Sequence, residues 1–222
     1  MTSTSSPSAI ELASLLCSRL CHDMMSPVGA LSNGLELLAD EKDPEMRRRC
    51  FELLQQSAQA SADKLKFFRL AFGAAGGFGE AVPVSEPRAV IEALVAGNGR
   101  IQADWHFPTE TLPKAAVKVL LNFAMIGIEA LVRGGTLDLA AESRSGATEI
   151  VVRAAGPRLA FDRTVGEALA GRLSVAELSS RTAPAFLIAE LARSLGGQLQ
   201  YAVEGEAGQG GALMLGAELP DG

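Results

Sequence analysis

Two long stretches with the apolar spacing of a helix occupy roughly the first 70 residues, and a short acidic break separates them. The second stretch begins at Pro44, where Asp43 is a candidate N-cap, and it continues to about Phe72. In the first stretch, leucine and methionine recur three, four or seven residues apart, at Leu12, Leu16, Leu20, Met24, Leu31, Leu35 and Leu38. The pattern predicts two long helices, and the short connection makes them antiparallel neighbours.

The length of these helices constrains the fold further. Each has roughly 30 residues and therefore spans about 45 Å at about 1.5 Å per residue. A single hairpin of this length leaves much of its two apolar stripes in water, whereas a second copy of the chain would cover them. We therefore expect a homodimer in which two hairpins form a four-helix bundle.

A glycine-rich stretch at 73–79 follows the second helix and predicts a flexible linker. After it, the pattern changes to short strands that alternate with helices. Strands are predicted at 81–84, 100–107, 136–141, 149–154, 198–203 and 212–219, and helices at 112–132 and 184–195. The expected fold class is α+β. It consists of a helical hairpin domain at 1–74, a linker at 75–80 and an α/β sandwich at 81–222, with one helical layer on a mostly antiparallel sheet.

Charge and composition exclude several classes of function. The chain has 20 Lys and Arg against 26 Asp and Glu, a net charge of −6, whereas proteins that bind nucleic acid or anionic membranes carry a basic surplus. No stretch reaches the roughly 18 apolar residues of a membrane-spanning helix, and the first residues lack the basic segment of a signal peptide. Three cysteines are an odd, sparse set that suits a reducing compartment. We therefore expect a cytoplasmic protein that binds neither nucleic acid nor membranes.

The chain has two histidines, His22 and His106. His106 falls in a predicted strand, and we interpret it as a structural or surface residue. With two histidines and no Cys-x-x-Cys pair, the sequence predicts no metal site. At about 100° per residue, His22 lies about 170° from the centre of the leucine stripe and is expected to point outward.

A surface histidine on a solvated face is the ordinary interpretation of such a position, but two neighbours favour a functional site. Pro27 lies inside the predicted helix, where it removes a hydrogen bond at a cost of about 3 kcal/mol. Gly29 lowers the helix propensity of the same exposed face. Unfavourable residues beside one exposed histidine indicate a function.

A neutral imidazole is a good nucleophile toward phosphorus and can pass a phosphoryl group to a carboxylate. Asp23, the next residue, is expected to orient the ring or take its proton, and ordinary surface polarity is the alternative. One turn away, hydroxyl and guanidinium groups are expected to contact phosphoryl oxygens, and an exposed methionine is expected to contact a partner. The supporting or partner-docking candidates are Ser18, Arg19, Met25, Ser26 and Pro27.

The segment His22-Asp23-x-x-Ser26-Pro27-Val28 resembles the H-box of two-component histidine kinases, whose pattern is His-Glu/Asp, three residues, Pro and an aliphatic residue. The motif lies on a long helix followed by a second one, as in the dimerisation and histidine-phosphotransfer domain of those kinases. The resemblance implies that His22 is phosphorylated and that the adjacent acid assists the transfer.

Residues 80–222 resemble the GHKL-type ATPase domain of the same kinases, but the residues that hold ATP there are replaced. Ala154 stands in the place of the aspartate that binds adenine, and either Ile126 or Glu129 stands in the place of the asparagine that binds Mg²⁺. Glycines that approach the phosphates are replaced by Arg158, Arg181, Ala183 and Ala185. We therefore expect neither ATP nor another cofactor to bind.

A phosphoacceptor histidine without an ATP site resembles the ChpT-type histidine phosphotransferases of alphaproteobacteria. The resemblance implies a homodimer that shuttles phosphate, through a phosphohistidine, between the aspartates of receiver domains that carry Mg²⁺. The expected donor is a CckA-type hybrid kinase, and the expected acceptors are CtrA- and CpdR-type response regulators of the cell cycle. The alternatives are a divergent ATP-dependent histidine kinase and a non-catalytic scaffold that docks on helical bundles.

Overall fold

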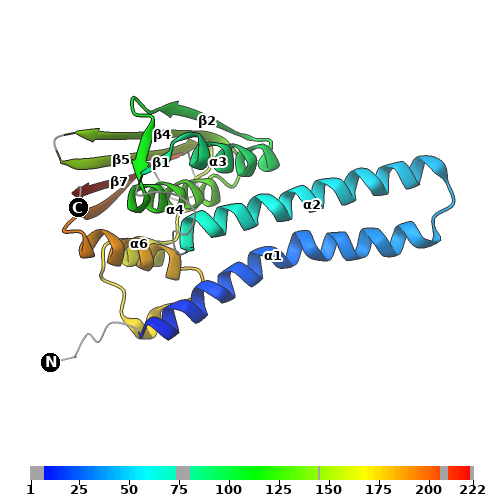
Figure 1. Ribbon diagram of the computed structural model, residues 1–222, viewed down its shortest axis with the longest axis horizontal. Helices are drawn as coiled ribbons and strands as arrows, with labels where there is room; N and C mark the ends of the chain where they lie inside the picture. Colours follow the sequence, from blue (N-terminus) through cyan, green and yellow to red (C-terminus); the bar gives the residue numbers. More distant parts are fainter. Residues whose placement is uncertain (1–7, 74–80, 145, 206–209, 221–222) are drawn as a thin grey trace.

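The computed structural model describes residues 8–73, 81–144, 146–205 and 210–220. A long helical hairpin projects from a domain in which helices cover one face of a β-sheet (Figure 1). The predicted α+β fold class, with an N-terminal hairpin and a C-terminal sheet domain, is confirmed. The predicted linker at 75–80 lies outside the described residues.

The hairpin consists of α1 (Ala9–Asp40) and α2 (Pro44–Phe72). Ser8 and Glu11 form a capping box at the start of α1, in which each side chain bonds the backbone N–H of the other residue. Asp43 caps α2 by accepting hydrogen bonds from the backbone N–H groups of Glu45 at 3.0 Å and Met46 at 2.9 Å. These caps satisfy N–H groups that have no partner inside the helix.

The main sheet has the strand order β2-β4-β5-β7-β6. Its strands are β2 (Ile101–His106), β4 (Gly135–Arg144), β5 (Ala147–Gly156), β6 (Gln198–Gly205) and β7 (Gly211–Pro220). Strands β2 and β4 are parallel, and the other three pairs are antiparallel. Along β4 and β5, side chains alternate between the buried helix side and the open side, so the sheet is apolar on one face only.

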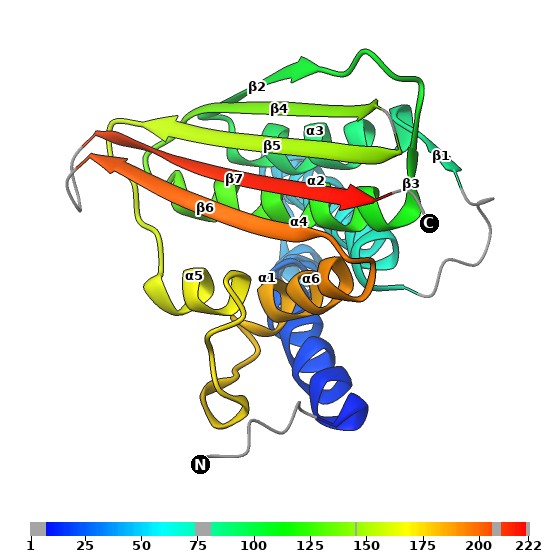
Figure 2. The ribbon, with the colours of Figure 1, turned by 90° about the vertical axis from the view of Figure 1, so that its left-hand side faces the viewer.

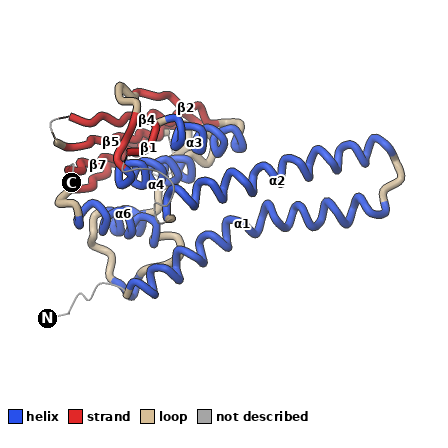
Figure 3. The backbone as a smooth tube through the Cα atoms, viewed as in Figure 1, coloured by secondary structure: helices blue, strands red, loops and turns tan. Residues whose placement is uncertain are grey.

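Helices cover that apolar face in one layer (Figures 2 and 3). They are α3 (Ser85–Asn98), α4 (Lys114–Ala130) and α6 (Ala183–Ser194), and the shorter α5 (Arg163–Leu169) and the 3₁₀ turn Val175–Glu177 lie between β5 and α6 in the chain. Helix α4 contributes ten buried residues, because it packs on the sheet on one side and on the base of α2 on the other.

Two sequence predictions in this domain were wrong in detail. The helix predicted from residue 112 begins at Lys114, because Thr111–Pro113 form a short strand, β3, that pairs with β1 (Ala81–Pro83). Helix α5 was not predicted at all, because seven residues are too few to show a helical period. Its interior glycine, Gly166, packs so closely on Tyr201 that a Cβ would lie 2.5 Å from the ring carbon Cζ.

The end of α2 belongs to the core of the sheet domain. Phe67, Phe68 and Ala71 are buried there, and the ring centroids of the two phenylalanines lie 5.5 Å apart in an edge-to-face arrangement. Leu20 and Met24 of α1 are partly buried against the same core. The hairpin base is therefore a third layer, packed on α4 on the side away from the sheet.

The helices can be compared with those that cross a membrane. None of the helices in the described ranges combines the length and the apolar character that a bilayer crossing requires.

The Phe67 side chain is 2% exposed, so Phe67→Ala opens a cavity where the hairpin meets the sheet domain. We expect the free energy of unfolding in urea to fall by about 3–5 kcal/mol. Val203→Ala, at an exposed position on β6, is the control and should change it by less than about 0.5 kcal/mol. Equal effects of the two substitutions would contradict the structural role of this junction.

Candidate functional site

His22 lies on α1 and its side chain is 81% exposed. The ring Nδ1 lies 3.1 Å from Oδ1 of Asp23, whose carboxylate is only 17% exposed. A carboxylate only accepts hydrogen bonds, so this contact favours the neutral tautomer that carries its proton on Nδ1. That tautomer leaves the lone pair of Nε2 free to act as a nucleophile.

The other predicted site residues divide into two groups. Ser18, Met25 and Ser26 are exposed, on the same helix as His22. Pro27 is the buried residue of α1, and Arg19 has only 14% of its side chain exposed. The structure therefore does not place Arg19 on the open face, because its guanidinium turns to the carboxylates of Asp23 and Glu129, between α1 and α4.

Pro27 lies within α1, and the helix continues through it. Proline has no N–H, so the carbonyl of Asp23, four residues earlier, lacks its usual helical donor. Lys64 of α2 fills this place, since its Nζ donates to the Asp23 carbonyl at 2.8 Å. A side chain of the second helix thus supports the turn that carries His22.

Arg19 connects α1 to the sheet domain. Its Nε donates to Oδ2 of Asp23 at 2.7 Å, and its Nη2 donates to the carboxylate of Glu129 on α4. Burial lowers the pKa of the Arg19 guanidinium, but the charge of Glu129 and the hydrogen bond to Asp23 raise it by more, so the group stays charged. The two oxygens of Asp23 therefore serve different partners, Arg19 on one side and His22 on the other.

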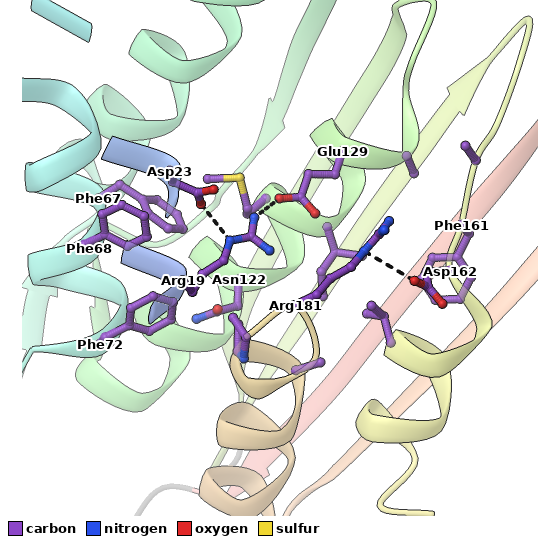
Figure 4. A pocket seen from close by; sticks show the side chains of 17 residues that line it. Arg19, Asp23, Phe67, Phe68, Phe72, Asn122, Glu129, Phe161, Asp162 and Arg181 are labelled. Atoms are coloured by element: carbon purple, nitrogen blue, oxygen red, sulfur yellow. Dashed lines mark hydrogen bonds and ion pairs between the residues drawn. The ribbon is translucent and has the colours of Figure 1, made fainter. Parts of the chain in front are cut away.

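Figure 4 shows the hollow behind Arg19, between the hairpin base and the sheet domain. Phenylalanine rings of α2 lie on one side, and Arg181, 3.3 Å from Asp162, lies on the other. The cavity volume is about 30 Å³, which is room for about two water molecules. Four residues that the sequence aligns with a nucleotide site line this hollow, namely Ile126, Glu129, Arg181 and Ala185.

The polar groups that line this hollow are bonded to one another or to the backbone, and three positions aligned with the ATP site hold alanine. Asn122 turns its amide to its own helix and donates to the carbonyl of Lys118 at 2.8 Å. Ala154, in the place of an adenine-binding aspartate, is completely buried in β5. Ala183 and Ala185 are also buried and offer only apolar side chains. The charged residues Arg19 and Glu129 neutralise each other.

His106 has an exposed side chain and belongs to β2, at the edge of the sheet. The strand β2 and the helix α1, which carries His22, lie on different sides of the helical layer (Figure 1). Within the described ranges, His, Cys, Asp and Glu side chains do not gather in threes as a metal ion requires.

Sequence reasoning did not identify Lys64 as part of the site, and it considered Glu129 only as a replacement for an asparagine. The missing donor beside Pro27 signals that some group must bond the Asp23 carbonyl. The identity of that group depends on the register of two helices, which periodicity does not give.

Comparisons with known proteins give three matches. The family described as histidine phosphotransferase C-terminal domain matches residues 84–207. The protein phosphotransferase ChpT of Brucella abortus (strain 2308) is 38% identical over 152 residues, which are 68% of this chain and 71% of that protein. A solved bacterial phosphotransferase superposes with a TM-score of 0.79 and 29% identity, over 96% of this chain and 98% of the other.

Lys64→Met removes the donor to the Asp23 carbonyl, and the unsatisfied carbonyl should lower the free energy of unfolding by about 1–3 kcal/mol. Pro27→Ala restores a backbone N–H at the position that normally bonds this carbonyl, so in that background Lys64→Met should cost about 0.5 kcal/mol or less. Urea denaturation of the four proteins measures this coupling.

Lys66→Met is the control for lost charge, because Lys66 is exposed and pairs only loosely with Asp63, at 3.5 Å. Equal costs of Lys64→Met with and without Pro27 would show that Lys64 does not compensate for the proline.

Proposed function

Since the chain belongs to the ChpT-type histidine phosphotransferase family, we propose that it shuttles a phosphoryl group between receiver-domain aspartates through a phosphohistidine at His22. One observation carries this proposal. His22 is open to a partner, and its Nδ1 faces a carboxylate that is itself held in place, so that Nε2 is free.

In the proposed reaction, the lone pair of Nε2 attacks the phosphorus of a receiver's aspartyl phosphate in line. An N–P bond forms, the O–P bond to the aspartate breaks, and that carboxylate is regenerated. The ring keeps its proton on Nδ1 and becomes positively charged, so the Asp23 carboxylate stabilises it. A carboxylate of a second receiver then attacks the phosphorus, and neutral His22 returns.

We also propose that this transfer does not depend on ATP. Supporting it, the buried alanines Ala154, Ala183 and Ala185 stand where the kinases have residues that hold ATP. A buried guanidinium, Arg19, also stands between the hairpin and α4, with its charge already matched by two carboxylates. The phosphoryl group must then come from another protein, and Mg²⁺ would be supplied by the receiver domain.

We further propose that CckA-, CtrA- and CpdR-type receivers dock around His22, in the cytoplasm. The exposed side chain of Met25 supports such docking, because an adaptable apolar group beside the reacting ring suits contact with several partners. Ser18 and Ser26 offer hydroxyl groups to the phosphoryl oxygens. The free thiols of Cys17, Cys21 and Cys50 suit a reducing compartment.

A homodimer is the last part of the proposal. Large apolar side chains are exposed along the hairpin, where a second hairpin would cover them. They include Val28, Leu35, Leu37, Met46, Phe51, Leu53 and Leu65.

His22→Ala should abolish phosphotransfer, because no other group replaces Nε2 as the nucleophile. A three-component assay with a labelled receiver, this protein and an acceptor receiver measures the effect, and His106→Ala is the control that should keep full transfer. Retained transfer by His22→Ala would contradict the proposal.

Two further results would favour the alternative functions. Labelling of the chain by ATP alone would favour a divergent kinase, and a biological effect that survives His22→Ala would favour a scaffold.

Light scattering at micromolar concentration should give twice the 23.1 kDa mass of one chain. Leu53→Glu places a charge among the exposed apolar side chains of α2 and should yield monomers, because an unpaired charge opposes burial. Val203→Glu, on the exposed strand β6, should leave the mass unchanged. A monomeric wild-type protein would contradict this part of the proposal.

A further inference from the structure

We propose that Glu129, in the sheet domain, is a positioning residue for phosphotransfer, and that it acts on His22 through Arg19 and Asp23. This inference rests on the proposed function of His22 and gives the C-terminal domain a part in that reaction. The four side chains form an unbroken line of contacts from α4 to the exposed ring.

The two oxygens of the Asp23 carboxylate have different partners. Oδ2 accepts from Arg19 Nε at 2.7 Å, whereas Oδ1 lies 3.1 Å from His22 Nδ1. A carboxylate whose one oxygen is held by a buried charge has little freedom to rotate. Arg19 therefore fixes the direction in which the other oxygen meets the imidazole.

The carboxylates of Asp23 and Glu129 together hold the guanidinium of Arg19. Its guanidinium has a planar fork of five N–H donors and readily takes both oxygens of a single carboxylate. Glu129 binds Nη2, next to the Nε that Asp23 binds, so one edge of the fork is shared between carboxylates of two helices. Without the Glu129 charge, a bidentate pair with Asp23 becomes the best arrangement left to Arg19, and it removes Oδ1 from His22.

The surroundings of Arg19 favour this response. The side chain is 14% exposed, and phenylalanine rings of α2 line the same hollow. A guanidinium with so little water contact must find its hydrogen bonds in the protein. Glu129 itself is exposed, but the Arg19 side chain is largely buried, so loss of the Glu129 charge leaves Asp23 as the carboxylate within reach of the guanidinium.

The consequence for His22 is a change of tautomer. When Oδ1 leaves Nδ1, the proton on Nδ1 loses its acceptor, and the form protonated on Nε2 gains population. That form has no lone pair on Nε2 and cannot attack phosphorus there. Transfer should slow even though His22 and Asp23 are both present.

Glu129→Gln tests this relay in the full-length protein, and Glu190→Gln is a closely matched control. Glu190 is 36% exposed and pairs with Arg193 on α6, whereas Glu129 is 37% exposed. Two quantities are measured for each variant, the single-turnover transfer rate from a phosphorylated receiver and the tautomer ratio of His22 by ¹⁵N NMR. His106→Ala spectra assign the two histidines.

We expect Glu129→Gln to transfer about 10- to 100-fold more slowly and to shift the neutral His22 ring toward the form protonated on Nε2. Glu190→Gln should match the wild type in both readouts. An unchanged tautomer ratio in Glu129→Gln would overturn the relay, whatever happens to the rate, because it would leave only a structural role for the ion pair.

A paired variant, Arg19→Met with Glu129→Met, separates positioning from stability. It removes both charges but leaves the Asp23 carboxylate without Arg19, so its urea midpoint should fall, and transfer is measured without urea, where circular dichroism shows the variant to be folded. Its transfer should remain slow, because nothing then holds Oδ2 of Asp23. Wild-type transfer by this variant would overturn the proposal. The tautomer readout does not depend on transfer, so it tests the relay even if His22→Ala disproves the proposed function.

Discussion

The largely buried guanidinium of Arg19 joins the two parts of the molecule, and the arrangement of the site depends on it. It bonds Asp23 on the same helix and Glu129 on α4, in a hollow lined by aromatic rings. A buried cation is tolerated only when its hydrogen bonds are satisfied, so both carboxylates are needed where they are. This requirement fixes how the base of the hairpin meets the helical layer, and it orients the carboxylate beside His22.

A second constraint comes from Pro27. A proline inside a helix normally kinks or breaks it, and α1 bends near its middle (Figure 1) but runs unbroken from Ala9 to Asp40. The Lys64 ammonium bonds the carbonyl that the proline leaves free, and the buried ring of Pro27 contributes apolar contact. The backbone of Asp23 is thus held from α2 and its side chain from Arg19, so the residue next to His22 is fixed at both ends.

Much of the architecture can be predicted from the sequence, because it depends on the periodic spacing of apolar residues. The two helices of the hairpin, the strands of the sheet and the outward direction of His22 all depend on the spacing of apolar residues, which local geometry fixes. The roles of Arg19, Lys64 and Glu129 do not follow in this way, since each depends on how separate elements pack. Helix α5 was not predicted for different reasons, because it is short and has a glycine, Gly166, in its interior.

In the proposed mechanism, His22 carries the phosphoryl group on its Nε2 atom. The measurement that tests this most directly is ³¹P and ¹⁵N NMR of the full-length protein after incubation with a phosphorylated receiver domain. We expect one phosphoramidate, in which the phosphorus is bonded to Nε2 of His22 and Nδ1 is still protonated. Phosphate on Nδ1, on another residue, or on none would contradict it.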